Sequence, residues 1–264
     1  MDANAYRQFL ELERTHWWFR GRRTVYLGLL RHALGVDRGA ERPRRALDVG
    51  AGMGGFLPGL AELARGVAHT DVDHESLRRC RERGFATGAV ASGTALPYAD
   101  ASFDLVCLFD TLEHTEDDGR VMREAARVLG PGGRVCVTVP AYQFLYANND
   151  RVARHVRRYT RARLRTLFEQ AGLTVERNSH SNVLLFPLIL PVVLAIKAGE
   201  RLFVRSPDAD HTNLSWPLPG FVHAALHAAF AAELPVTRRA DWPVGHSIVA
   251  IARKPAAAAR APAA

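Results

Sequence analysis

A cluster of glycines follows an acidic residue at the end of a short apolar run. The run closes on Asp48, and Gly50, Gly52, Gly54 and Gly55 come next, before apolar residues resume at helical spacing. Glycine lets the backbone approach a ligand closely, and the first amides of a helix have no partners within the helix. This stretch therefore predicts a nucleotide-type pocket between a buried strand and a helix.

A second acid follows the glycine cluster by roughly twenty residues. Asp71 ends another short apolar run, at the point where sheets of the Rossmann type hold ribose hydroxyls. Asp73 is the alternative for this role. An acid here can instead cap the helix expected to begin near His74, and that interpretation suits Asp73 better than Asp71.

Two histidines are candidates for acid–base chemistry. His114 follows the apolar run 103–109, and His155 lies in a long loop after the next expected strand. Ligands of open parallel sheets bind at the carboxyl ends of the strands, and imidazole can accept a proton near neutral pH. We expect His155 to be the first candidate for a general base and His114 the second. Helix capping by Glu113 and His114, and a reaction without a dedicated base, are the alternatives.

The loop around His155 also carries side chains that could bind a substrate. Arg157 and Arg158 could clamp a phosphate or carboxylate, although the solvated start of a basic helix would also explain them. Trp17 and Trp18 belong to an aromatic run that could pack the N-terminal arm or line the pocket entrance. The expected substrate-binding residues are Trp17, Trp18, Tyr142, Tyr146, Arg157, Arg158 and Tyr159, with Asp150 in the same wall.

The elements that position these residues alternate between strand and helix from Arg44 onward. This pattern is typical of an α/β fold with a doubly wound parallel sheet. Strands are expected at 45–49, 67–72, 85–90, 103–109, 133–139 and 173–178, and helices at 54–65, 74–83, 116–129 and 164–172. The run 103–109 is almost continuously apolar, as expected of a strand that is covered on both faces.

Several linked motifs resemble the class I S-adenosylmethionine-dependent methyltransferases, in particular the methyltransferase type 11 and ubiquinone-menaquinone methyltransferase group. DVGAGMG, TALPYADASFDLV, DTLEH and ARVLGPGG occur in the family's order over roughly residues 44–140. The resemblance implies that S-adenosyl-L-methionine is the cofactor. It also implies a Rossmann-like sheet of seven strands, with an antiparallel last strand at 245–254 on the edge of the sheet.

The resemblance assigns roles to individual residues. Asp71 precedes Leu77 by the separation that the family's ribose-binding acid shows, and the Asp110 region would abut the methionine part of the cofactor. Ser92 stands where many relatives have an acid for the adenine amino group, so adenine binding would depend on the backbone near Gly93 and on apolar walls such as Leu96. The expected cofactor-binding residues are Asp48, Gly50, Gly52, Gly54, Asp71, Ser92, Gly93 and Asp110.

The His155 region carries its own resemblance. A subset of the family has a similar His-x-Arg-Arg-Tyr run after the fifth strand, and in related small-molecule methyltransferases a histidine in this region serves as the base. This comparison supports His155 over His114.

An apolar insertion of some 60 residues separates the last two expected strands. Its part 183–196 is uncharged, is interrupted by Pro187 and Pro191, and is followed by Arg201 and Arg205. It could form a kinked interfacial helix pair, a lid over an apolar substrate, or a buried core helix. We expect a lid that covers the substrate and faces a membrane.

A second helix is expected at 219–233. His223 and His227 are four residues apart in it, which is a metal-ligand spacing, but no third ligand accompanies them, and no metal is predicted. The expected divisions are 1–40 as an N-terminal arm of two helices joined by THWWFRGRR, 41–180 as the cofactor-binding core, 181–240 as the insertion, 241–254 as the final strand and 255–264 as a disordered tail.

Composition narrows the class of partner. The net charge is +8, and arginines cluster at 19–23, 41–45 and 151–165, which suits an anionic partner or a solvated helix surface. No appended RNA-binding module and no motif for a flipped base accompany these clusters, so nucleic acid ranks below a small molecule as substrate. The sequence shows no signal peptide and no apolar run long enough to span a membrane, and its three cysteines are an odd number. These features favour a cytoplasmic protein with at most peripheral membrane contact.

These features together predict a methyltransferase that O-methylates an apolar or amphiphilic acceptor, such as a quinone, a lipid-linked compound or a polyketide-like compound. Methylation of nitrogen or carbon stays open, because the core motifs indicate the methyl donor and say little about the acceptor atom. The alternative is a non-catalytic cofactor-binding or membrane-docking protein, and an RNA methyltransferase ranks lower. The sequence defines neither the acceptor nor the oligomeric state.

Overall fold

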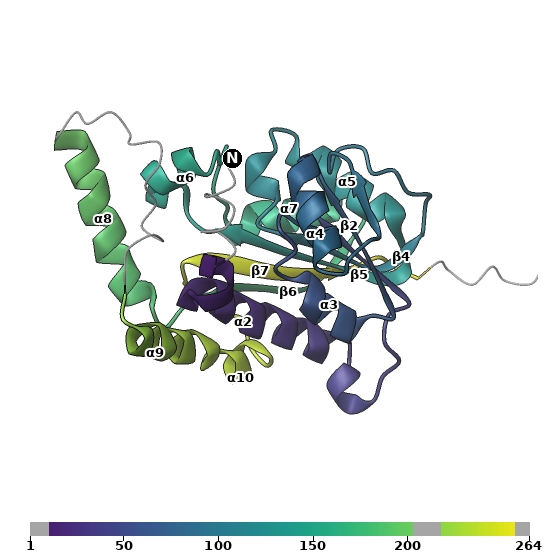
Figure 1. Ribbon diagram of the computed structural model, residues 1–264, viewed down its shortest axis with the longest axis horizontal. Helices are drawn as coiled ribbons and strands as arrows, with labels where there is room; N and C mark the ends of the chain where they lie inside the picture. The colour runs from purple at the N-terminus through teal and green to yellow at the C-terminus, as the bar shows by residue number, and fades with distance from the viewer. Residues whose placement is uncertain (1–10, 203–217, 257–264) are drawn as a thin grey trace, which may run out of the picture.

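The computed structural model describes residues 11–202 and 218–256, and its centre is a seven-stranded sheet (Figure 1). The strand order is β3-β2-β1-β4-β5-β7-β6, and β7 is antiparallel to both of its neighbours. The strands are β1 (Arg45–Val49), β2 (Gly66–Asp71), β3 (Gly88–Val90), β4 (Phe103–Phe109), β5 (Leu129–Pro140), β6 (Thr174–Ser181) and β7 (Ser247–Arg253). The expected seven-stranded, doubly wound sheet is confirmed. The expected edge position of the antiparallel last strand is wrong, because β7 pairs with both β5 and β6 and leaves β6 at the edge.

Helices cover both faces of the sheet. One buried cluster joins the sheet to α5 and α7, and another joins it to α2 and α3 on the opposite face (Figure 1). The helices are α2 (Trp17–Ala33), α3 (Leu57–Leu63), α4 (His74–Glu82), α5 (Asp118–Val128), α6 (Asn148–Val152), α7 (Arg161–Gln170), α8 (Phe186–Leu202), α9 (Gly220–Ala231) and α10 (Leu234–Thr237), with 3-10 turns η1 (Val36–Arg38), η2 (Leu112–His114) and η3 (Gln143–Leu145).

The strand β4 occupies the middle of the sheet, where its apolar sequence predicts it. All of its residues except Asp104 are buried. Cys107 on β4 faces Cys136 on β5 across the sheet register, and both are buried free thiols, as expected from their apolar surroundings.

Several boundaries differ from the sequence expectation, most of them by a few residues. The third strand is only Gly88–Val90, and β5 begins already at Leu129, with a register shift against β4 that absorbs the expected Pro-Gly-Gly turn. The helix α7 begins at Arg161 rather than at 164, because the Thr160 side chain accepts a hydrogen bond from the Arg163 N–H at 3.2 Å. Capping side chains therefore extend a helix beyond its first apolar residue.

The aromatic run of the N-terminal arm lies inside α2, which corrects the expectation that it joins two helices. His16 caps the helix by accepting from the Trp18 N–H at 3.3 Å, so that Trp17 and Trp18 form its first turn. The helix continues through the whole run, and further along it Val25, Tyr26 and Leu29 join the core cluster that contains sheet residues and Phe230 of α9. Residues 11–15 are also helical, whereas 1–10, with the expected helix residues Phe9 and Leu10, lie outside the described residues.

In the described residues, the insertion forms the long helix α8 and the shorter helices α9 and α10. In place of a kinked pair, 186–202 is the single helix α8 with Pro191 inside it, and Figure 1 shows α8 extending away from the sheet beside α9. Residues 203–217, with Arg205, and 257–264, most of the expected tail, lie outside the described residues. Within 11–202 and 218–256, no helix combines the length and the apolar character needed to cross a membrane.

The helix α9 packs on α2 through its histidines. The Trp17 N–H donates to His223 Nδ1 at 3.3 Å, and Thr24 Oγ1 lies 3.2 Å from His227 Nε2. A Cβ on Gly21 would lie 2.3 Å from Phe230 Cδ1, so the glycine permits this close approach. The two histidines therefore hold α9 in place and do not form the metal pair that their spacing suggested.

Candidate active site

A cavity of about 1620 Å³ runs along the carboxyl edge of the sheet. It is lined by the glycine loop after β1, by η2, by α6 and by one side of α8. Open parallel sheets bind ligands at this edge, and a site for one small ligand typically measures roughly 300–1,000 Å³. The cavity therefore has room for two molecules side by side.

The glycine loop forms the first part of this wall. Gly50 and Gly52 have left-handed backbones with φ of 73° and 54° and line the cavity. A Cβ on Gly50 would lie 2.6 Å from Thr111 Cγ2, whereas a Cβ on Gly52 would meet nothing within 4 Å. Gly54, with φ of 78°, packs against Cys80 and is not in the cavity wall.

The structure separates the two acids that the sequence left as alternatives. Asp71 lines the cavity, and its carboxylate accepts from the Gly52 N–H at 2.8 Å and from the Asp73 N–H at 2.9 Å. Asp73 is the N-cap of α4 and accepts from the Glu75 and Ser76 N–H groups. Asp71 is therefore the acid that can reach a ligand in the cavity.

Asp48 lies beneath the loop rather than in the cavity wall, which corrects its expected contact with the cofactor. It is 2% exposed, and burial, together with the charge of Asp71, raises its pKa to about 8. Within the described residues, its buried Oδ1 has no hydrogen-bond partner.

The far end of this wall contains Ser92 and Gly93, as expected. The Ser92 hydroxyl lies 2.8 Å from Thr94 Oγ1 and accepts from the Thr94 N–H. Leu96, in contrast, is buried in the core and outside the cavity lining, because its N–H donates to Glu124 Oε2 at 2.8 Å.

An ion pair between Arg22 and Asp110 lies between the loop and η2. Asp110 has φ of 52° and accepts from Thr138 Oγ1 at 2.9 Å, and its other oxygen pairs with Arg22. The Arg22 guanidinium carbon lies 4.2 Å from the centre of the Trp18 ring. Arg22 was not expected here, because nothing in the sequence links it to a residue so far along the chain.

His155 is oriented by Asp150. Its Nδ1 lies 2.8 Å from Asp150 Oδ1, and Arg158 donates to both oxygens of the same carboxylate at 2.9 Å. Burial acts to raise the pKa of Asp150, but the hydrogen bonds from His155 and Arg158 outweigh it and lower the pKa to about 2. A charged Asp150 holds the proton on His155 Nδ1, so the Nε2 atom is free to accept one.

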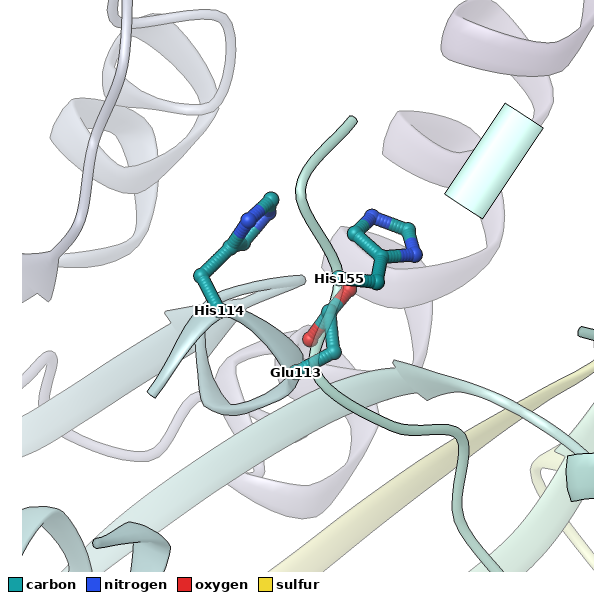
Figure 2. Close-up of side chains that lie close together, drawn as sticks. All are labelled: Glu113, His114 and His155. Carbon is teal, nitrogen blue, oxygen red and sulfur yellow. The ribbon is translucent and has the colours of Figure 1, made fainter. Parts of the chain in front are cut away.

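Figure 2 shows Glu113 and His114 converging on His155. The rings of His114 and His155 are 4.8 Å apart and nearly perpendicular, and one ligand atom from each of the three residues lies within 4.8 Å of the others. Burial, followed by the charge of Asp110, raises the pKa of Glu113 well above its usual range. Burial, followed by the charge of His155, lowers the pKa of His114. Two imidazoles and a carboxylate could also bind a divalent transition metal, which the sequence did not predict.

Four of the expected substrate-binding residues lie outside the cavity lining. Tyr146 donates to the His155 carbonyl at 2.7 Å, and Tyr142 stacks on His180 at 5.2 Å. The Tyr159 hydroxyl is buried 2.9 Å from Asp118 Oδ2, and Arg157 forms an ion pair with Asp118 at 3.0 Å. These side chains fix the loop that carries His155 and do not line the cavity.

Trp17, Trp18 and Arg158 do line the cavity, as expected. The opposite wall belongs to α8 and the turn before it. Apolar side chains line the cavity from the end of this turn along α8: Leu185, Leu188, Ile189, Val192, Val193 and Ile196.

Comparison with known protein families and relatives gives consistent results. The family described as a methyltransferase domain matches residues 47–137. Methyltransferase GfsG of Streptomyces halstedii is 37% identical over 204 residues, which cover 67% of this chain and 72% of that protein. A probable S-adenosylmethionine-dependent methyltransferase of Mycolicibacterium smegmatis is 31% identical over 169 residues, so the chain spans only 62% of the length of that relative.

A solved structure shares the fold over nearly the whole chain. N-methyltransferase NodS of Bradyrhizobium japonicum, in complex with S-adenosyl-L-homocysteine, superposes with a TM-score of 0.54 and 17% identity, covering 93% of this chain and 97% of that one.

Proposed function

The chain belongs to the class I S-adenosylmethionine-dependent methyltransferases, and we propose that it methylates a hydroxyl group of an apolar or amphiphilic small molecule. The observation that carries the proposal is the continuous cavity. It joins the glycine loop and Asp71 to His155, and His155 to the apolar side of α8.

The residues of the first half of the cavity fit the methyl donor. The backbone of Gly52 faces open space, and Asp71 can accept from ribose hydroxyls. The Arg22–Asp110 pair offers one charge of each sign, which matches the carboxylate and the ammonium of a methionine group. S-adenosylmethionine supplies an activated methyl group when it is bound there.

The His155–Asp150 pair would remove the proton of the acceptor hydroxyl. His155 Nε2 takes the proton, and the charged Asp150 stabilises the imidazolium that forms. Arg158 keeps Asp150 charged and fixed. The remaining contribution is alignment, because transfer between two bound groups gains from the orientation that the cavity imposes.

The apolar side of α8 supports an apolar acceptor. A quinone, a lipid-linked compound or a polyketide-like compound could bury its hydrocarbon part against Leu188, Ile189 and Val192. We extend the proposal to a cytoplasmic protein with peripheral membrane contact. The exposed apolar side chains Leu184, Leu194 and Phe221, with exposed fractions of 47%, 45% and 76%, support that contact.

The test combines binding with turnover. Calorimetric titration with S-adenosylhomocysteine should show binding by the wild type and none, or much weaker binding, by Asp71→Ala. With a long-chain alkylcatechol as acceptor, His155→Gln should lower kcat by about 10²–10⁴-fold and leave the affinity for S-adenosylhomocysteine unchanged.

The control is His74→Gln, which changes an exposed histidine at the start of α4. A folded wild type that does not bind S-adenosylhomocysteine would overturn the methyltransferase proposal. Full activity of His155→Gln would remove only the assignment of the base. Binding without turnover for every acceptor class would instead favour a non-catalytic cofactor-binding protein.

A further inference from the structure

We propose that Asn182, in the cavity wall between β6 and α8, anchors a neutral polar group of an elongated acceptor. The inference rests on the function proposed above and concerns which acceptor the site selects.

Asn182 is a buried amide without a partner. It lines the cavity, it is 0% exposed, and within the described ranges neither its Oδ1 nor its Nδ2 has a hydrogen-bond partner. A buried amide without hydrogen bonds is costly to a folded protein, and nearly all such groups are satisfied. A ligand in the cavity can supply the missing donor and acceptor.

The backbone holds this amide in place. Asn182 connects β6 to the start of the α8 region with φ of 55°, a left-handed conformation that asparagine tolerates better than most residues. The carboxylate of Glu233 accepts from the N–H of Asn182 and from that of Val183, both at 2.8 Å. Glu233 is itself buried, so the turn cannot rotate freely. The side chain is therefore positioned before any ligand binds.

The sheet register gives the approximate separation of Asn182 from Asp110 in the donor half of the cavity. Ser181 at the end of β6 is paired with Ser247 on β7, and Ser247 is paired with Pro140 at the end of β5. Asp110 follows β4, the next strand. Neighbouring strands lie roughly 4.8 Å apart, so β6 is about 14 Å from β4 along this edge. A group bound at Asn182 is therefore about that far from the donor half of the cavity, and an acceptor that also reaches His155 must be elongated.

The chemistry of the amide restricts the group at the far end. Asparagine offers a donor and an acceptor and carries no charge. It pairs best with a group that also has both, such as a carboxamide or a hydroxyl. Between this group and the methylated oxygen, the acceptor would lie against apolar side chains of the α8 region such as Leu185 and Ile189.

The experiment uses catechols with a straight alkyl chain that ends in a primary carboxamide, in a methyl group or in a primary amine. Chain length is varied, and affinity is measured by calorimetry on protein saturated with S-adenosylhomocysteine. The wild type should bind the carboxamide about tenfold more tightly than the methyl-ended probe once the chain is long enough to reach Asn182, and equally at short lengths.

Two variants test the residue without straining the turn. Asn182→Gly removes the amide but keeps the backbone N–H and the positive φ, so the carboxamide advantage should disappear. Asn182→Asp keeps the shape and adds a charge, so preference should switch to the amine-ended probe. The methyl-ended probe is the internal control, and its affinity should be the same in all three proteins.

A carboxamide advantage that survives in Asn182→Gly would overturn the inference, as would its absence at every chain length in the wild type. Binding of S-adenosylhomocysteine without binding of any probe would also overturn it while leaving the donor site intact. Failure to bind S-adenosylhomocysteine would instead reject the proposed function.

Discussion

The reactive end of the cavity depends on a histidine whose ring is fixed by a carboxylate. Asp150 contacts His155 through a side-chain bond and also accepts the His155 N–H at its carbonyl, at 2.8 Å in each case. The same carboxylate holds Arg158. A base that is held in one tautomer before the acceptor binds needs little rearrangement during proton transfer.

The proximity of Glu113 and His114 to this histidine predicts inhibition by zinc. Zn²⁺ prefers imidazole and carboxylate ligands of this kind and would occupy His155 Nε2, which the base must keep free. Initial rates should fall as Zn²⁺ is added, recover with EDTA and be less sensitive in Glu113→Gln. Mg²⁺ is the matched control, because it prefers oxygen ligands and should not inhibit.

Activation by Zn²⁺ would contradict this expectation. It would mean that a metal, and not the imidazole, prepares the acceptor hydroxyl.

Single residues of the site could be predicted only where a motif or a strand end places them. Gly50, Asp71 and His155 follow strands that the sequence reveals, and the structure brings all three to the cavity. The direction of Arg157 could not be predicted, because its ion pair with Asp118 forms across two elements. Arg22 was missed for the same reason, since its partner lies on another part of the sheet.

At the level of elements, the junction of β6 with α8 is tied to the segment between α9 and α10 through Glu233. Burial raises the pKa of Glu233 to about 7 from its usual 4.5, although the two N–H groups that it accepts act against the rise. The junction that positions Asn182 is therefore sensitive to pH.

The stability of the protein should show this dependence. Below pH 4.5 Glu233 is protonated in both folded and unfolded states, so it adds no pH dependence to the free energy of unfolding. Between about pH 4.5 and 7 only the unfolded chain loses the proton, so the free energy of unfolding should fall by up to about 1.4 kcal/mol per pH unit.

Chemical denaturation at pH 4.5 and pH 7 can isolate this contribution by comparing the wild type with Glu233→Gln. Other buried acids titrate equally in both proteins, so the difference between them reports on Glu233. A wild type whose stability changes with pH just as that of the variant does would show that Glu233 titrates normally.

Elements were predicted best where the pattern is long and apolar. The strand 103–109 was found residue for residue, because a strand covered on both faces must be apolar throughout. The aromatic run at Trp17 and Trp18 was placed outside a helix, because an N-cap by the His16 ring has no strong sequence signature. The single helix through Pro191 was also missed, because an interior proline usually ends or kinks a helix.

At the scale of the whole molecule, the donor half of the cavity connects three elements that lie far apart in the N-terminal half of the chain. Its wall includes Trp18 on α2, Asp71 on β2 and Asp110 after β4. A ligand there binds only the folded arrangement, so it should stabilise the entire fold.

We expect S-adenosylhomocysteine at about 100 times its dissociation constant to add about 2.7 kcal/mol to the stability. For a chain of this size the thermal midpoint should then rise by roughly 5–10 °C. Asp71→Ala at the same ligand concentration is the comparison and should show little increase. An equal increase in the variant would place the ligand away from Asp71.

The two ends of the insertion join neighbouring strands of the sheet, and this arrangement has a consequence for evolution. The chain leaves the sheet at Ser181 and returns at Ser247, and these two residues are register partners on adjacent strands. The two points at which the segment 182–246 joins the sheet therefore lie side by side, so a change in its length need not change the strand order. Lineages could diversify the compounds that they modify by replacing this segment alone, and a chimera that grafts a relative's segment between these two serines is a direct route to new acceptors.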